Sequence, residues 1–285
     1  TISANLLDGG GNGGLTKTGA GTLVLSGTNT YTGTTTVSQG KLQIGDAAGL
    51  AGSLGGNVVL QNSNSIVFTA TANQSYGGVI SGTGKLEKYG NGSTLTLSGN
   101  GSVISRGIDI NGSSTLRNTG SATVGTTTIY NNGGVFNNEG TFTLSGNLQN
   151  AAWIPNATFA NSGTINQTGS NGIIFLNEAA SFANTGTITV NRLSVGDWGD
   201  GGAATTATFT NGAGGNMTIT DMYVGGWKYG TYNNNGGSLT VASTLNIGKP
   251  SDSRTAAAGT NTFNLNSGTV TVNAGATFRL GASGG

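Results

Sequence analysis

The sequence predicts an all-β fold, a right-handed parallel β-helix (β-solenoid) with about 12 coils of roughly 23 residues each. Three observations predict it. Apolar residues alternate with Thr, Ser and Asn in short runs, 54 of the 285 residues are glycine, and an aromatic residue followed by Asn recurs at regular intervals. A short period made of strands and turns does not suit a propeller blade and lacks the helix of a helical repeat.

Short strands are expected along the whole chain, because helical periodicity is missing throughout. The alternating runs include residues 23–25, 37–44, 58–60, 95–97 and 187–190. Turns that contain glycine or Asn bound these runs, as is typical of half-buried strands. Glycine provides the positive φ that tight corners between such strands require.

An internal repeat marks the first part of the chain. GNGGLTKTGAGTLVLSG at 11–27 aligns with GTGKLEKYGNGSTLTLSG at 82–99, with one residue inserted near Ser93. Lys17 aligns with Lys88 in this comparison. We expect both lysines, and Lys85 beside the second, to lie in turns and to keep the surface soluble.

A second repeat fills the rest of the chain and predicts two ladders. Each copy has an aromatic residue and then Asn two residues later, before a turn and a short strand. In a solenoid, equivalent residues of successive coils stack, so the aromatic residues should form a core ladder and the Asn side chains a hydrogen-bonded turn ladder. The core ladder comprises Phe136, Phe159, Phe182, Phe209, Tyr232 and Phe263. The turn ladder comprises Asn138, Asn161, Asn184, Asn211 and Asn234.

An aromatic patch is the candidate contact site for a ligand or partner. Trp198 and Trp227 each follow the valine of a recurring Val-Gly element by three residues, and Lys228 and Tyr229 lie beside the second indole. Exposed aromatic residues in a row can stack on sugar rings or anchor a partner protein. A local cap over an outward loop is the alternative interpretation.

The first repeat resembles the autotransporter-associated β-strand repeat of bacterial surface proteins. The resemblance rests on residues 13–56 and 78–100, with the core pattern L-x-K-x-G-x-G-x-L-x-L-S-G, and covers about 11–117. Residues 118–285 carry the Phe-x-Asn-x-Gly repeats, and 1–285 is expected to form a single β-solenoid. The resemblance implies an extracellular or outer-surface location on a bacterium and a role as a passenger stalk or adhesin segment.

Composition excludes several functions. The chain has no His and no Cys, which removes the usual triads and zinc sites, and its net charge of +1 disfavours nucleic acid as a partner. No apolar run is long enough for a transmembrane segment. Asp197 and Asp200 are weak candidate calcium ligands, because two carboxylates supply few of the six to eight oxygens that Ca²⁺ takes. No two acids are expected at matching positions of adjacent coils, so we predict no catalytic site and no cofactor.

Three functions stay open at this point. The first is a non-catalytic secreted or cell-surface β-solenoid that acts as a passenger stalk or adhesin segment. The second is a subunit of a self-assembling extracellular filament or sheath. The third and most remote is a β-helix that binds or cleaves polysaccharide. The expected partners are other copies of the chain, laterally or end to end, and glycans or the surface of a host or neighbouring cell.

Overall fold

The fold is a parallel β-solenoid, as the sequence predicts. The computed structural model describes residues 1–46, 48–90, 92–125, 129–150, 156–167, 173–176, 179–196, 205–225, 229–248 and 260–281. The described residues contain strands and turns but no helix, and so no helix that could cross a membrane. The chain divides into two units, Thr1–Ile129 with Gly134–Thr143, and Tyr130–Gly133 with Leu144–Gly285.

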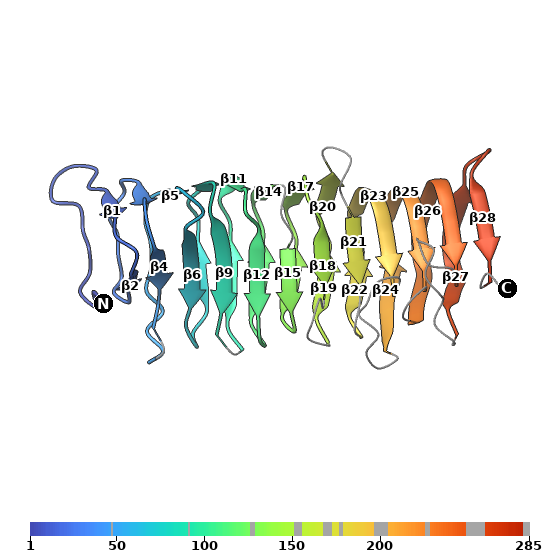
Figure 1. The fold of residues 1–285 in the computed structure, drawn as a ribbon, viewed down its shortest axis with the longest axis horizontal. Helices are drawn as coiled ribbons and strands as arrows, with labels where there is room; N and C mark the ends of the chain where they lie inside the picture. The colour runs from blue at the N-terminus through green and yellow to red at the C-terminus, as the bar shows by residue number, and fades with distance from the viewer. Residues whose placement is uncertain are drawn as a thin grey trace. The chain divides into compact units, whose positions relative to one another are not determined.

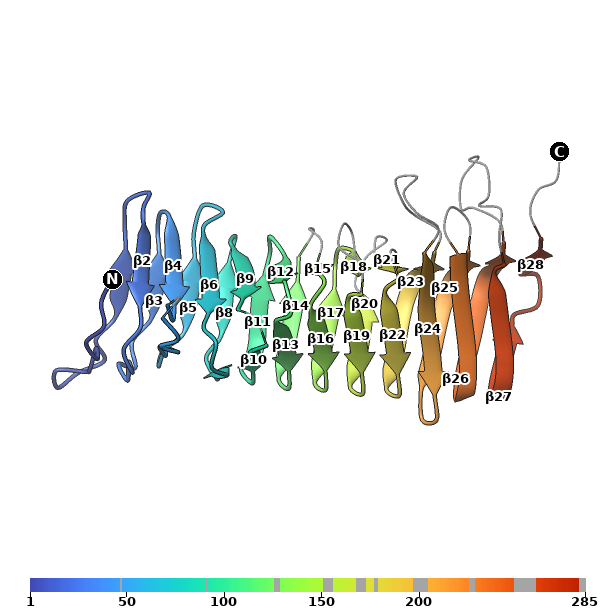
Figure 2. The same ribbon diagram turned by 90° about the horizontal axis from the view of Figure 1, so that it is seen from below.

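Three stacks of parallel strands form the walls of the first unit, and the chain visits one stack after another (Figures 1 and 2). One stack contains β2 (Thr22–Leu25), β4 (Lys41–Ile44), β6 (Ser65–Thr69), β9 (Lys85–Tyr89) and β12 (Ile108–Asn111). A second contains β7 (Gln74–Tyr76), β10 (Thr94–Leu97), β13 (Thr115–Asn118) and β16 (Val135–Asn138). The third begins with β1 (Leu15–Lys17), β3 (Thr35–Val37), β5 (Val58–Leu60) and β8 (Ile80–Gly82), and further along β11 (Asn100–Ile104) pairs with β14 (Ser121–Val124).

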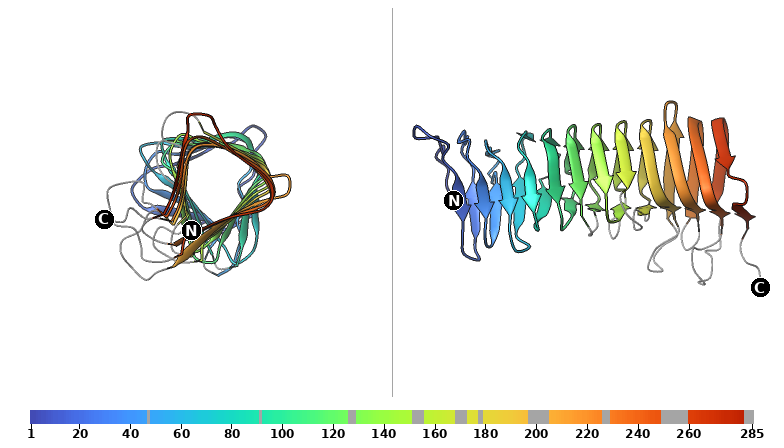
Figure 3. Two further views of the ribbon diagram at one scale, coloured as in Figure 1. Left: turned by 90° about the vertical axis from the view of Figure 1, so that its right-hand side faces the viewer. Right: turned by 90° about the horizontal axis from the view of Figure 1, so that it is seen from above.

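The second unit repeats this plan, and its later strands are longer than those of the first unit. Its early strands are β18 (Leu148–Asn150), β19 (Thr158–Asn161), β20 (Thr164–Gln167), β21 (Ile173–Leu176) and β22 (Ser181–Asn184). Its later strands are β23 (Thr187–Val195), β24 (Thr206–Gly212), β25 (Asn216–Val224), β26 (Tyr229–Ile247), β27 (Thr262–Val272) and β28 (Thr277–Leu280). Figure 3 shows these long strands, yellow to red, bending around the interior of the unit. Two further strands, β15 (Ile129–Asn132) and β17 (Thr141–Leu144), contribute residues to both units.

The length of a coil varies around the predicted value of roughly 23 residues, as the unequal spacing of the recurring aromatic residues indicates. Leu23 pairs with Leu42 in the first unit, whereas Leu245 pairs with Phe278 in the second, and the second step along the chain is much the longer. Part of the variation lies within the strands, because the register shifts between β25 and β26 and between β26 and β27. The predicted coil of roughly 23 residues is confirmed, but the described residues form about 9 coils with a strand in all three stacks, and not the predicted 12.

Each coil buries alternate residues in its interior, and glycine allows the coils to approach closely at one corner. The inward side chains Leu42, Ile66, Leu86 and Ile108 pair in register and are fully buried. A Cβ atom at Gly120 would clash with the backbone carbonyl oxygen of Gly99 in the preceding coil. Bare backbone at this corner therefore maintains the spacing of about 4.8 Å between parallel strands.

The N-terminal segment packs against the first complete coil. Ile2 forms a bridge with Leu25, and the side-chain oxygen of Asn5 accepts a hydrogen bond from the Thr28 amide at 2.8 Å. The Asp8 carboxylate accepts hydrogen bonds from Gly13 N (2.8 Å), Thr32 N (3.0 Å) and Thr32 Oγ1 (2.6 Å). The hydrogen bond from the Thr32 hydroxyl is the main reason why the pKa of Asp8 is lowered.

Candidate functional site

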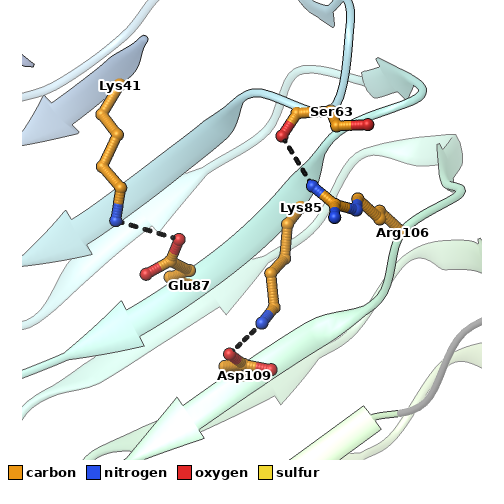
Figure 4. A network of polar contacts seen from close by, with 6 residues as sticks. All are labelled: Lys41, Ser63, Lys85, Glu87, Arg106 and Asp109. Atoms are coloured by element: carbon orange, nitrogen blue, oxygen red, sulfur yellow. Dashed lines mark hydrogen bonds and ion pairs between the residues drawn. The ribbon is translucent and has the colours of Figure 1, made fainter. Parts of the chain in front are cut away.

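A charged cluster lies on the outward face of the stack that contains β4, β6, β9 and β12 (Figure 4). Because side chains alternate along a strand, Lys85 and Glu87 of β9 point away from the interior that Leu86 fills. Register then places Asp109 of β12 directly beside Glu87. The cluster comprises Lys41, Lys85, Glu87, Asp109 and Arg106, with the Ser63 carbonyl group as a further acceptor.

Two carboxylates therefore occupy matching positions of adjacent coils, and the expectation that no acids do so is wrong. Glu87 and Asp109 are register partners on β9 and β12, in a part of the chain where the coil length varies. Like charges side by side on neighbouring strands repel each other, so this pair requires compensation.

Lysines provide that compensation by bridging coils. The Lys41 ammonium of β4 reaches across β6 to Glu87 Oε1 of β9 at 3.4 Å, and the Lys85 ammonium contacts the Asp109 carboxylate of β12. Arg106 Nη1 donates to the Ser63 carbonyl oxygen at 3.1 Å. Four strands of one stack, or the segments that lead into them, are thus tied together from outside.

Asp109 is the member of the cluster that burial affects most clearly. Burial raises the pKa of Asp109, and its hydrogen bond and attraction to Lys85 only partly oppose this effect. Its Oδ1 atom is buried and has no hydrogen-bond partner among the described residues. Burial, and next the proximity of Glu87, also raise the pKa of the Tyr89 hydroxyl. The lysines thus compensate the charges of Glu87 and Asp109 on neighbouring coils. The Oδ1 atom of Asp109 is buried, so a ligand cannot reach it.

The predicted core residues stack in the second unit, where Phe159, Phe182, Phe209 and Tyr232 are buried and Phe263 is half-buried. The rings of Phe159 and Phe182 have centroids 4.3 Å apart, those of Phe182 and Phe209 4.5 Å, and those of Tyr232 and Phe263 4.8 Å. Phe209 and Tyr232 are also stacked, at 5.7 Å. In the first unit, Phe136 packs edge-on against Phe142 at 5.1 Å.

The predicted Asn residues are buried at one corner of the coils. Asn161 Nδ2 donates to Asn184 Oδ1 (2.8 Å), Asn184 Nδ2 to Asn211 Oδ1 (2.9 Å), and Asn211 Nδ2 to Asn234 Oδ1 (2.9 Å). In the first unit, Asn118 Nδ2 donates to Asn138 Oδ1 at 2.8 Å. Sequence reasoning missed Asn118 because Leu116 replaces the aromatic residue, although the Asn-x-Gly spacing was present.

The predicted aromatic patch lies almost entirely outside the described residues. Trp198, Trp227 and Lys228 are not among them, and the same holds for the candidate calcium ligands Asp197 and Asp200. Tyr229 is the first residue of β26, is partly exposed and pairs with Thr206 of β24. Within the parts of the chain that the structure covers, no group of three or more acidic residues could hold a metal ion.

The fold and the ladders define a structural repeat protein of the β-solenoid class. Residues 15–44 match the family described as the passenger-associated-transport-repeat. The predicted resemblance to autotransporter passenger repeats is therefore confirmed, on the segment where the L-x-K-x-G pattern begins. No curated protein and no solved structure matches the chain.

Proposed function

We propose that the chain is a non-catalytic stalk or adhesin segment of a passenger-type protein on the outer surface of a bacterium. The observation that carries this proposal is the continuous coil-to-coil pairing in each unit, reinforced by polar ladders inside and by charge bridges outside. The passenger repeat at 15–44 supports the location. We further propose that 1–285 forms a single solenoid whose repeat type changes near residue 118.

The shape and association of the purified chain test the stalk proposal. Sedimentation velocity and negative-stain electron microscopy over a hundredfold range of concentration should give discrete particles with one sedimentation coefficient. Antibodies against the chain should label intact cells that produce it as strongly as permeabilised cells. Labelling only after permeabilisation would refute the surface location.

A self-assembling filament is the second candidate, and the low charge of the chain favours it. Only 7% of the residues are charged, which leaves little repulsion between the strands of two molecules. Arg279 is the only charged residue in the described segment 260–281. Edge strands that lack charge and proline readily accept another strand. Fibres that lengthen with concentration, and that disappear in a Thr271→Lys variant, would establish this function instead.

Adhesion through glycans is a separate property that the aromatic patch would provide. We propose Trp198, Trp227, Lys228 and Tyr229 as the contact residues. Glycan-array binding by the wild-type chain that is lost in the Trp198→Ala/Trp227→Ala double variant would support an adhesin. New reducing ends released from a polysaccharide by the wild-type chain would establish the cleavage alternative instead.

A further inference from the structure

Two lysines of the first unit are buried, contrary to the expectation that they face solvent. Lys17 is 7% exposed and Lys88 is fully buried, whereas the Lys85 side chain is 28% exposed. Lys17 Nζ donates to the carbonyl oxygens of Thr18 (2.8 Å), Gly19 (2.6 Å) and Gln39 (3.0 Å). These hydrogen bonds compensate the buried ammonium, because a buried charge without a partner would strongly destabilise the fold.

Lys88 is held in a similar way. Its Nζ atom donates to the Tyr89 carbonyl oxygen at 2.7 Å and to Ser93 Oγ at 2.8 Å. Ser93 Oγ in turn lies 2.6 Å from the Ala70 carbonyl oxygen, to which it donates, in the preceding coil. Lys17 reaches the following coil directly through Gln39. Each ammonium therefore closes its own corner and connects it to a neighbouring coil.

The two lysines occupy different corners of the solenoid. Lys17 ends β1 in one stack and precedes β2, while Lys88 lies near the end of β9 in the next stack and precedes β10. The two copies of the sequence repeat are therefore not equivalent coil positions. They share only the local arrangement of strand, lysine, glycine-containing turn and strand, so the buried lysine belongs to that corner motif.

The Asn ladder donates to turn carbonyl groups with the same local spacing as Lys17. Asn161 Nδ2 donates to the carbonyl oxygen of Gly163, and Asn184 Nδ2 to that of Gly186, each two residues further along the chain. Lys17 donates to Gly19 with the same spacing. At these corners an amide or an ammonium thus donates to a turn carbonyl group, and the Gly163 and Gly186 carbonyl oxygens also accept the backbone N–H groups of Thr187 and Asn216, both at 2.9 Å.

Charge explains why the lysines do not form ladders. An Asn side chain both donates and accepts, so it can repeat in every coil, whereas ammonium groups in adjacent coils would repel each other. The register neighbour of Lys17 is Val37, and those of Lys88 are Phe68 and Ile110. Each buried charge therefore has only uncharged side chains beside it in its own column.

We propose that the L-x-K-x-G motif encodes an internal alkylammonium site, in which the corner carbonyl groups bind the lysine ammonium and so fix the corner against the adjoining coil. The site recognises a primary ammonium on a short alkyl chain. Truncation of the lysine to alanine should leave a site that takes n-propylammonium, which closely matches the atoms removed.

Rescue by a small amine tests the proposal at Lys17. Lys17→Ala should lower the melting temperature of the first unit by about 3–10 °C, since three part-buried hydrogen bonds from the ammonium to carbonyl groups are lost. Millimolar n-propylammonium should restore at least about half of this loss, because a ligand that binds only the folded state stabilises it. Tetramethylammonium and n-propanol, which lack either the N–H donors or the charge, should not.

Matched variants separate this site from simple packing. Lys17→Met fills the volume without donors and should be destabilised but not rescued. Lys41→Ala, which removes an ammonium from a side chain that is 51% exposed, should show no rescue. The same set at Lys88 repeats the experiment at a second corner, and if Lys88→Ala does not fold, Lys17 decides alone. Full stability of Lys17→Met, or equal rescue by n-propanol, would overturn the proposal.

Discussion

The replacement Asn184→Asp tests the turn ladder with almost no change in the volume of the side chain. Asn184 is fully buried, donates to Asn211 Oδ1 at 2.9 Å and to the Gly186 carbonyl oxygen at 3.1 Å, and accepts from Asn161 Nδ2 at 2.8 Å. An ionised Asp keeps the acceptor but loses both donated hydrogen bonds. It also places a carboxylate oxygen against two other acceptors.

The expected loss follows from those two hydrogen bonds. Asn211 Oδ1 is left buried without the donated amide, whereas the Gly186 carbonyl oxygen still accepts Asn216 N at 2.9 Å. A buried acceptor without a donor costs about 1–3 kcal/mol, so Asn184→Asp should lower the free energy of unfolding by at least about 1–3 kcal/mol at neutral pH. Burial and the two facing oxygens should raise the pKa of the new carboxyl group in the folded state. Since the folded state then binds the proton more tightly, the variant should regain stability as the pH falls through that raised pKa.

Guanidinium unfolding followed by far-ultraviolet circular dichroism, at pH 7.5 and again near pH 5, measures both effects. Asn235→Asp is the matched control, because Asn235 is exposed and its side-chain oxygen accepts from Asn266 Nδ2, a role that Asp retains. The control should change stability by less than about 0.5 kcal/mol. Equal losses in the two variants, or a loss at Asn184 that does not depend on pH, would refute the reasoning.

The packing and the burial of Lys88 lead to three further predictions. Phe182→Ala should cost about 3–5 kcal/mol, measured by the same unfolding assay, because it removes a buried ring stacked at 4.3 and 4.5 Å, and a melting shift within error would mean that the ring is not packed. Gly120→Ala should sharply lower the melting temperature, whereas Gly21→Ala, whose Cβ would meet nothing within 4 Å, should not. Burial lowers the pKa of Lys88 from 10.5 to about 8, so the unfolded state binds the extra proton between these values and stability should rise with pH across that window. In denaturant titrations from about pH 7.5 to 10.5, Lys88→Met should lack this rise, and parallel profiles would contradict it.

The fold class could be predicted because a solenoid repeats its chemistry. Spacing alone aligned Phe159, Phe182 and Phe209, and the register pairs them ring on ring. The Asn that follows two residues later points to the same side of its strand, so its burial beside the aromatic residue was implied by the period of two.

The charged cluster could not be predicted because the register in this unit does not follow a fixed period. The inward column of this stack runs through Leu23, Leu42, Ile66, Leu86 and Ile108, and no two of its steps along the chain are equal. A fixed period therefore does not bring Glu87 beside Asp109. Lys41 lies two strands away from Glu87, a proximity that only the stacked arrangement reveals.

The burial of Lys17 and Lys88 is indicated by the sequence, but it is easily overlooked. Leu15 and Lys17, like Leu86 and Lys88, are two residues apart, and a strand places such residues on the same face. Lysine side chains are usually exposed, so the motif predicted a turn with its lysine in solvent. The turn carbonyl groups of this chain accept hydrogen bonds from Asn side chains where equivalent coils stack in series, and from a buried lysine at the two L-x-K-x-G corners.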